Sequence, residues 1–179
     1  MAPNYKTELP MPVLTIQYNG LFDLDGMYAA VTDWAKNYGF MWHEKKYNHK
    51  VPSPSGAEQE IDWEMTNRVT EYFQYTIWVS LHLYDLRDVE IEVSGKKRNL
   101  SNARIGIKIN GKVDYDYQNL RKKSKFTAWL ATFKDEKIND LEDYEGQLYY
   151  RIQNLHNLVK QYLDLQSKKY IYFNRLGEN

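Results

Sequence analysis

The chain of 179 residues contains no cysteine, so it can form neither a disulfide framework nor a thiolate metal site. Lysine and arginine together number 24, as do aspartate and glutamate, which gives a formal net charge of zero. That balance argues against a general nucleic-acid coat and against binding to anionic membranes through net charge. No run approaches the roughly 18 apolar residues of a membrane span, and the first residues lack the apolar region of a signal peptide. We expect a soluble, cytoplasmic protein that does not bind membranes.

The sequence also lacks the short motifs of common active sites. It has no glycine-rich phosphate loop, and no serine stands in the strand–turn–helix context of a nucleophile elbow. His43 and His49 are too far apart in sequence to share a zinc ion from one helical face, and on a strand they would lie roughly 20 Å apart. His82 and His156 stand alone on a predicted strand and a predicted helix. These absences favour a non-enzymatic protein with no metal and no cofactor.

Tyrosine and alternating hydrophobicity are what the sequence has in abundance. There are 16 tyrosines and 5 tryptophans, and many of the tyrosines fall at strand positions, which favours a thick amphipathic sheet over a wet interface. Residues 61–83 alternate with period two, the pattern of a sheet with one buried and one solvated face. The predicted inward residues are Ile61, Trp63, Met65, Phe73, Tyr75, Ile77, Val79, Leu81 and Leu83.

Such a long alternating stretch must turn, because most strands span only about five or six residues. The polar residues Asn67 and Glu71 on the apolar face place the first turn near residues 66–70. An odd-numbered loop preserves the inward parity and would pair Met65 with Glu71 and Trp63 with Phe73.

Two further turns are predicted along the same reasoning. Residues 85–87 would form a three-residue turn, followed by an outward row of Asp88, Glu90 and Glu92 facing Arg104 and Lys108 on the next strand. Residues 94–97 would begin a basic loop. Asn110-Gly111 is a strong hairpin signal. It would align Val113 with Ile107 and Tyr115 with Ile105.

Helical periodicity appears on both sides of this sheet region. Asp25 is the expected cap of a helix that ends at Gly39, whose left-handed conformation would be clasped by Phe40. Ser124 would cap a second helix, and a third, longer helix begins near Asp140. Gly146 lies within that long helix and predicts close packing or a kink.

The predicted fold is α+β: a curved antiparallel sheet of about six to seven strands, one N-terminal helix and two C-terminal helices, the last packed on the sheet. Residues 1–12 would form an extended arm, and residues 13–179 a single domain.

Three sets of residues are candidates for binding. Glu60, Asp62 and Glu64 would line one strand face with a spacing of roughly 6.6 Å, which fits paired catalytic carboxylates, but without a pocket they indicate a solvated face paired with lysines. The aromatic residues expected on the outward face, a candidate surface for a protein partner, are Tyr72, Trp78 and Tyr84. The basic residues that could contact phosphate are Lys96, Lys97, Arg98, Arg121, Lys122, Lys123 and Lys125.

The order of the expected elements, a strand, a helix, several antiparallel strands and a long closing helix, resembles the helix-grip (START-like) fold. In that fold a curved sheet wraps a C-terminal helix around an apolar cavity. The resemblance concerns element order and not a sequence motif, and it has one N-terminal helix where the family usually has two. It implies that the cavity would be lined by Trp63, Tyr75, Ile107 and Leu155.

The function that these features favour is a non-enzymatic binding module. It would engage a protein partner, or a second copy of itself, through the aromatic sheet and the long C-terminal helix. Two alternatives stay open. A helix-grip carrier or enzyme would hold an apolar small molecule, and a nucleic-acid or ribonucleoprotein binder would use the basic segments, with an affinity that falls steeply with salt.

Overall fold

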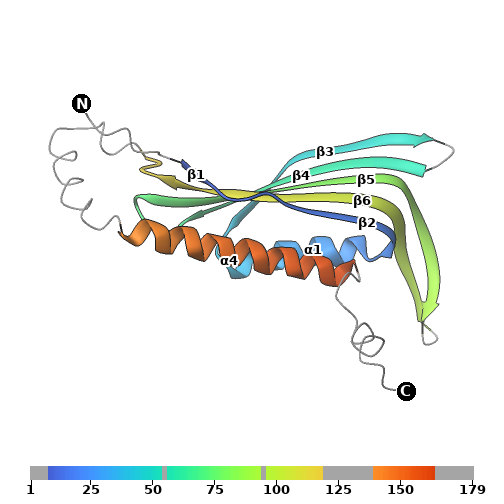
Figure 1. The fold of residues 1–179 in the computed structure, drawn as a ribbon. Helices are drawn as coiled ribbons and strands as arrows, with labels where there is room; N and C mark the ends of the chain where they lie inside the picture. The colour runs from blue at the N-terminus through green and yellow to red at the C-terminus, as the bar shows by residue number, and fades with distance from the viewer. Residues whose placement is uncertain (1–7, 54–55, 94–95, 119–138, 164–179) are drawn as a thin grey trace, which may run out of the picture.

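Two helices lie on one face of a six-stranded antiparallel sheet in the computed structural model (Figure 1). The structure describes residues 8–53, 56–93, 96–118 and 139–163. The strands are β1 (Glu8–Pro10), β2 (Leu14–Phe22), β3 (Met41–Ser53), β4 (Gly56–Arg68), β5 (Phe73–Val93) and β6 (Lys96–Tyr115). The helices are α1 (Leu24–Asn37) and α4 (Asn139–Tyr162). The α+β class is confirmed for these residues, and the helix predicted from Ser124 lies outside them.

The strand order is β1-β6-β5-β4-β3, and β2 also pairs with β6. β1 and β2 therefore follow one another along the same edge of β6, where β1 pairs with residues 112–114 and β2 with residues 101–109. Part of the expected N-terminal arm is thus a strand of the sheet. β3 forms the opposite edge.

The predicted inward row forms the core between the sheet and the helices. Trp63, Ile77 and Ile107 each expose 2% of their surface or less. α4 contributes Leu148, Ile152, Leu155 and Val159, all buried. Burial of these apolar side chains is the main favourable contribution to the stability of the fold, at about 25 cal/mol per Å² removed from water.

The last residue pair between β4 and β5, Arg68 with Gln74, encloses an odd number of residues, as predicted, but the predicted pairing is wrong. Arg68 pairs with Gln74, and Trp63 pairs with Val79 instead of Phe73. The hydroxyl of Thr70 accepts hydrogen bonds from the backbone N–H groups of Tyr72 (3.2 Å) and Phe73 (3.0 Å), which builds the loop. The turn therefore centres on residue 71 and not on the residues before it.

The second pairing predicted for the first turn is also wrong, since Met65 pairs with Ile77 and not with Glu71. Asn67, one of the polar residues on which the predicted turn was based, belongs to β4 and not to the turn. Its side-chain amide donates to the carbonyl oxygen of Tyr38 at 2.9 Å and so joins β4 to the end of α1.

The turn predicted at residues 85–87 is a bulge within β5. The strand continues to Val93, but its register with β6 shifts between Tyr84 and Arg87, and Asp85 has a positive φ of 58°. A bulge adds one residue to a strand and bends it. Figure 1 shows β5 and β6 turning away from the rest of the sheet in this part of the molecule.

The bulge also reverses the parity of β5, so the predicted outward position of Asp88 is wrong. Asp88 pairs with Ser101, which is buried on the inner face. The predicted ion pairs of Glu90 and Glu92 with Arg104 and Lys108 are wrong as well. Glu90 pairs with Lys97 (2.8 Å), and the Arg104 guanidinium lies 2.8 Å from Asp85.

The hairpin predicted at Asn110-Gly111 is wrong, because β6 runs unbroken through both residues. Asn110 pairs with Trp78 and Gly111 with Ile77. A Cβ atom at Gly111 would lie 2.8 Å from Cδ1 of Ile152 and 3.0 Å from the carbonyl oxygen of Thr76. The glycine therefore allows α4 to approach the sheet closely and does not form a turn.

Two other predictions for β6 differ from the structure. Val113 pairs with Tyr75, and Tyr115 pairs with Phe73, so neither aligns with Ile107 or Ile105. The predicted basic loop at 94–97 is shorter than expected, since its last two residues already belong to the strand.

α1 begins two residues earlier than expected. Its N-cap is Asp23, whose Oδ1 accepts a hydrogen bond of 2.8 Å from the backbone N–H of Gly26, while Asp25 lies in the first turn. Its predicted end is confirmed. Gly39 has a φ of 73°, and the N–H of Phe40 donates to Ala35 (2.8 Å), the pattern of a Schellman motif.

α4 crosses the inner face and also contacts α1. Trp34 of α1 donates from Nε1 to Oδ1 of Asn154 at 2.8 Å. The guanidinium of Arg151 lies 5.3 Å from the ring centre of Tyr75, within cation–π range. The close packing predicted at Gly146 is wrong, because a Cβ atom there would have no heavy atom of another described element within 4 Å.

Candidate ligand cleft

A bulge in β3 separates the charges of that strand between the two faces of the sheet. Glu44 pairs with Trp63, and Lys46 pairs with Asp62, so Lys45 is the extra residue. Glu44 therefore shares the inner face with Trp63, whereas both lysines turn toward the outer face. The strand can in this way supply opposite charges to opposite sides.

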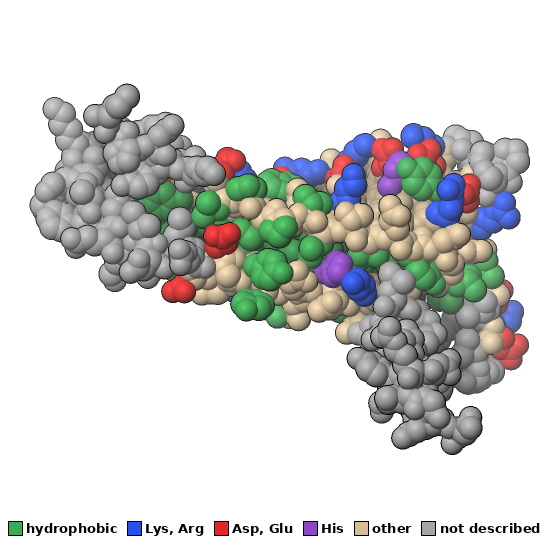
Figure 2. Space-filling view, in the orientation of Figure 1, with side chains coloured by type: hydrophobic (Ala, Val, Ile, Leu, Met, Phe, Trp, Pro, Cys, Tyr) green, Lys and Arg blue, Asp and Glu red, His purple; other side chains and the backbone are tan. Residues whose placement is uncertain are grey.

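The outer face carries the acidic row predicted from the sequence, and its expected pairing with lysines is confirmed for Glu60 and Glu64. Lys45 lies 2.9 Å from Glu64, and Lys46 lies 2.5 Å from Glu60. Lys50 lies 3.3 Å from Glu58. Figure 2 shows basic and acidic side chains interspersed where β3 and β4 run. This face is a network of exposed ion pairs, which contribute little individually.

Because of these ion pairs, we expect the free energy of unfolding to depend on pH. The side-chain bond from Lys46 lowers the pKa of Glu60 from 4.5 to about 2. The folded-state pKa lies below the unfolded one, so the ionised carboxylate stabilises the fold above about pH 4.5, and this contribution is lost as the pH falls toward about 2. We expect Lys46→Met to flatten the dependence of the unfolding free energy on pH across this window, measured by urea denaturation.

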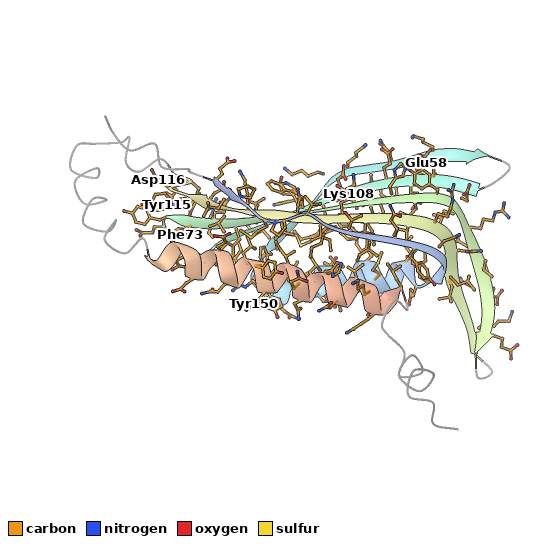
Figure 3. All side chains as sticks on the ribbon, in the orientation of Figure 1. Glu58, Phe73, Lys108, Tyr115, Asp116 and Tyr150 are labelled. Atoms are coloured by element: carbon orange, nitrogen blue, oxygen red, sulfur yellow. The ribbon has the colours of Figure 1, made fainter. Side chains whose placement is uncertain are left out.

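Lys108→Met is the matched control. Lys108 is exposed, and Figure 3 places it on the sheet side opposite the helices, as it does Glu58. No ion pair joins Lys108 to the described residues. Its replacement should leave the slope unchanged. Equal slopes for wild type and Lys46→Met would show that the Lys46–Glu60 pair does not stabilise the folded state.

Within the described residues, one group has the geometry to hold a metal ion. Ligand atoms of Glu58, Glu60 and His82 all lie within 4.8 Å of one another. However, Nε2 of His82 already lies 2.6 Å from Glu58, and lysines lie against both carboxylates. A metal ion would have to displace these contacts, so the arrangement fits an ion-pair network better than a metal site.

The aromatic residues predicted as a partner surface do not gather into one patch. Trp78 and Tyr84 lie on the same face of β5 but roughly 20 Å apart at about 3.3 Å per residue. Trp78 donates from Nε1 to Glu64 at 3.0 Å, and the ring of Tyr84 stacks on His82 with centroids 4.0 Å apart. Tyr72 stacks on Tyr115 beyond the start of β5.

The four residues predicted to line an apolar cavity all lie in the hydrophobic core. Trp63, Tyr75, Ile107 and Leu155 expose 2% of their surface or less. The hydroxyl of Tyr75 donates to the carbonyl oxygen of Tyr144 at 3.0 Å, and burial raises its pKa to about 12.

The predicted phosphate contacts are only partly described. Lys97 is exposed and paired with Glu90. Lys96 and Arg98 belong to β6, but their side chains lie outside the described part of the structure, as do Arg121, Lys122, Lys123 and Lys125.

A cleft of about 730 Å³ lies between the N-terminal end of α1 and the bent part of the sheet. All four long strands, β3–β6, contribute residues to it, and Ile61 among them is buried. We call this the α1 cleft. Its residues are Asp23, Leu24, Asp25, Tyr28, Glu44, Tyr47, His49, Ala57, Gln59, Ile61, Leu86, Asp88, Asn99, Leu100 and Ser101.

Polar side chains are held in place along the β3 wall of the α1 cleft. The hydroxyl of Tyr28 donates to Oε2 of Glu44 at 3.2 Å. Burial, together with the adjacent carboxylate of Glu44, raises the pKa of Tyr28 to about 12, so this hydroxyl stays protonated at neutral pH. The amide nitrogen of Gln59 lies 2.9 Å from Nδ1 of His49 and 3.3 Å from the hydroxyl of Tyr47.

Sequence reasoning missed the α1 cleft. Its members come from α1 and four strands, and two bulges decide which side chains face it. A doubled lysine after Glu44 is a signal for the first bulge, since strict alternation cannot place both lysines beside the acidic row. The second bulge gave no comparable signal, because Asp85 also suits a turn.

Comparison with known proteins gives no family for this chain. No family model matches it, and a search of curated proteins finds no match. The resemblance to the helix-grip fold therefore rests on element order. Among the described helices, none has the length and apolar character to cross a membrane.

Proposed function

We propose that the chain is a non-enzymatic binding protein that takes a small molecule in the α1 cleft. The observation that carries this proposal is the size and position of the cleft. A volume of about 730 Å³ lies within the range of about 300–1,000 Å³ that is typical of small-molecule sites. Its walls combine aliphatic and aromatic side chains with a few fixed polar groups, as such sites do.

The α1 cleft supports this function better than the other surfaces do. The outer-face aromatic residues are spread along β5 and bonded to neighbours, whereas binding hot spots cluster. The core residues first proposed to line an apolar cavity pack against one another beneath the helices. A ligand therefore fits beside the core and not within it.

Fragment screening by protein-observed NMR tests the proposal directly. The probe is a library of soluble fragments divided equally among cationic, neutral and anionic compounds. We expect several fragments to shift backbone amide signals around Ile61, Leu86 and Ser101. Ala57→Trp should abolish these shifts, because the indole would fill the cleft that Ala57 borders.

Ser80→Trp provides the matched control, since Ser80 is an exposed residue on the outer face of β5. It introduces the same side chain on the opposite side of the sheet and should leave the fragment shifts intact. If no fragment shifts the cleft signals, or if Ala57→Trp leaves the shifts unchanged, the α1 cleft is not a ligand site.

A further inference from the structure

We infer that the ligand of the α1 cleft is an organic cation, an amine with an apolar body. This inference rests on the proposed function and adds the chemical class of the ligand. Four carboxylates line the cleft, from Asp23, Asp25, Glu44 and Asp88, and among the described residues that line it none is a lysine or an arginine. All four residues are exposed, and carboxylates of one sign along a cleft favour a positive ligand.

Glutamates on the outer face are paired with lysines, so the absence of such lysines among the described residues of the α1 cleft distinguishes the cleft from that face. On the outer face, Glu58, Glu60 and Glu64 each lie within 3.3 Å of a lysine. In the α1 cleft, neither Glu44 nor Asp88 forms an ion pair with any described residue. The bulge in β3 sends Lys45 and Lys46 to the outer face and leaves Glu44 on the inner one, where it accepts a hydrogen bond from Tyr28 but has no described lysine beside it. The same strand therefore neutralises one face while leaving the other negative.

Two of the four carboxylates have a structural role that needs no ligand. Asp23 caps α1, and Asp25 lies in its first turn, where a negative charge complements the helix dipole. Glu44 and Asp88 are not part of a helix cap, although Glu44 also accepts a hydrogen bond from Tyr28 of α1, and they come from β3 and β5. These two are the groups that we expect an ammonium to contact.

The remaining walls indicate an organic cation and not a bare metal ion. Tyr28 and Tyr47 offer aromatic rings, which attract ammonium groups through their faces. Leu86, Leu100 and Ile61 add aliphatic surface that only a ligand with an apolar body would cover. A metal ion would fill little of the roughly 730 Å³ available.

Three indole compounds test the inference, because they share a ring and differ in charge. Tryptamine is cationic, tryptophol is neutral and indoleacetate is anionic at neutral pH. In NMR titrations of the full chain we expect tryptamine to bind at the α1 cleft at least about tenfold more tightly than tryptophol, and indoleacetate more weakly still.

Matched variants assign the effect to the carboxylates. Glu44→Gln should weaken tryptamine binding by about fivefold and leave tryptophol binding unchanged, because one attractive charge is lost. Asp62→Asn removes the same charge from the outer face and should change neither affinity. Tyr28→Phe removes the hydroxyl group that donates a hydrogen bond to Glu44 but keeps the carboxylate. This variant should retain the preference for tryptamine. It therefore distinguishes the effect of the Glu44 charge from the effect of losing this hydrogen bond.

The outcomes distinguish this inference from the proposed function. If neutral or anionic fragments occupy the α1 cleft while tryptamine binds no better than tryptophol, the ligand is not a cation, although the cleft remains a binding site. Equal effects of Glu44→Gln and Asp62→Asn would also overturn the inference. If no compound of any charge shifts the cleft signals, both proposals fail together.

Discussion

Truncation of Trp63 to alanine is expected to lower the free energy of unfolding by about 3–5 kcal/mol, among the larger losses that a single substitution causes. Trp63 exposes only 2% of its surface, and its ring lies 5.0 Å from that of Tyr28 of α1. Alanine would leave a large cavity between the sheet and α1. Urea denaturation followed by tryptophan fluorescence and circular dichroism measures the loss.

Trp78→Ala is the control for this prediction. Trp78 lies on the neighbouring strand but on the outer face, where it is half-buried and bonded to Glu64. Its truncation should cost no more than about 1.5 kcal/mol. Similar losses at both tryptophans would contradict the assignment of inner and outer faces. Should Trp63→Ala fail to fold, Trp63→Phe retains a ring at the site and should lose clearly less than the alanine variant.

A methyl group at Gly111 is expected to destabilise the fold by about 1–3 kcal/mol, the usual cost of overpacking. In Gly111→Ala the new Cβ would lie 2.8 Å from Cδ1 of Ile152, closer than real contacts allow, and 3.0 Å from a strand carbonyl oxygen. The Ile152 side chain, α4 or the sheet would have to shift. Chemical denaturation of the variant gives the size of the effect.

Two further variants make the Gly111 prediction specific. Ile152→Val removes the Cδ1 atom, so in the double variant it should recover part of the loss caused by Gly111→Ala. Gly146→Ala places the same methyl group on α4 in open space, and should raise the unfolding free energy by about 0.4–1 kcal/mol. A neutral Gly111→Ala variant would show that α4 does not pack closely on β6.

The alternation of residues 61–83 was sufficient to predict the inner face of the sheet. Period-two hydrophobicity reports which side chains are buried, and Trp63, Ile77 and Val79 are buried as expected. The end of α1 was predictable for a similar reason, because Gly39 can adopt the left-handed conformation at little cost.

The register of the strand pairs was harder to predict from the sequence, because the alternation of buried and exposed residues is compatible with several registers. The turn near residue 71 depends on a hydroxyl at Thr70, and a single polar side chain does not announce such a contact. Asn110-Gly111 has the composition of a turn, but the glycine is required by α4, which lies far away in sequence. Local chemistry indicated a hairpin, and long-range packing decided otherwise.

The α1 cleft also combines features that the sequence predicts with features that it does not. Its aliphatic floor follows from the inward parity of Ile61, whereas the inward positions of Glu44 and Asp88 depend on bulges in two strands. A bulge changes the face of every residue that follows it. Sequence patterns that assume strict alternation therefore place these acids on the wrong side.

The pairing of β2 with β6 bears on how the protein is made. Among the described strands, β2 precedes β3–β6, and β6, against which it lies, follows the other long strands and is therefore synthesised after them. Contacts between such distant segments slow folding. We expect β2 and α1 to wait while β3–β6 assemble as successive hairpins, so that docking of the early strand is among the last steps of folding.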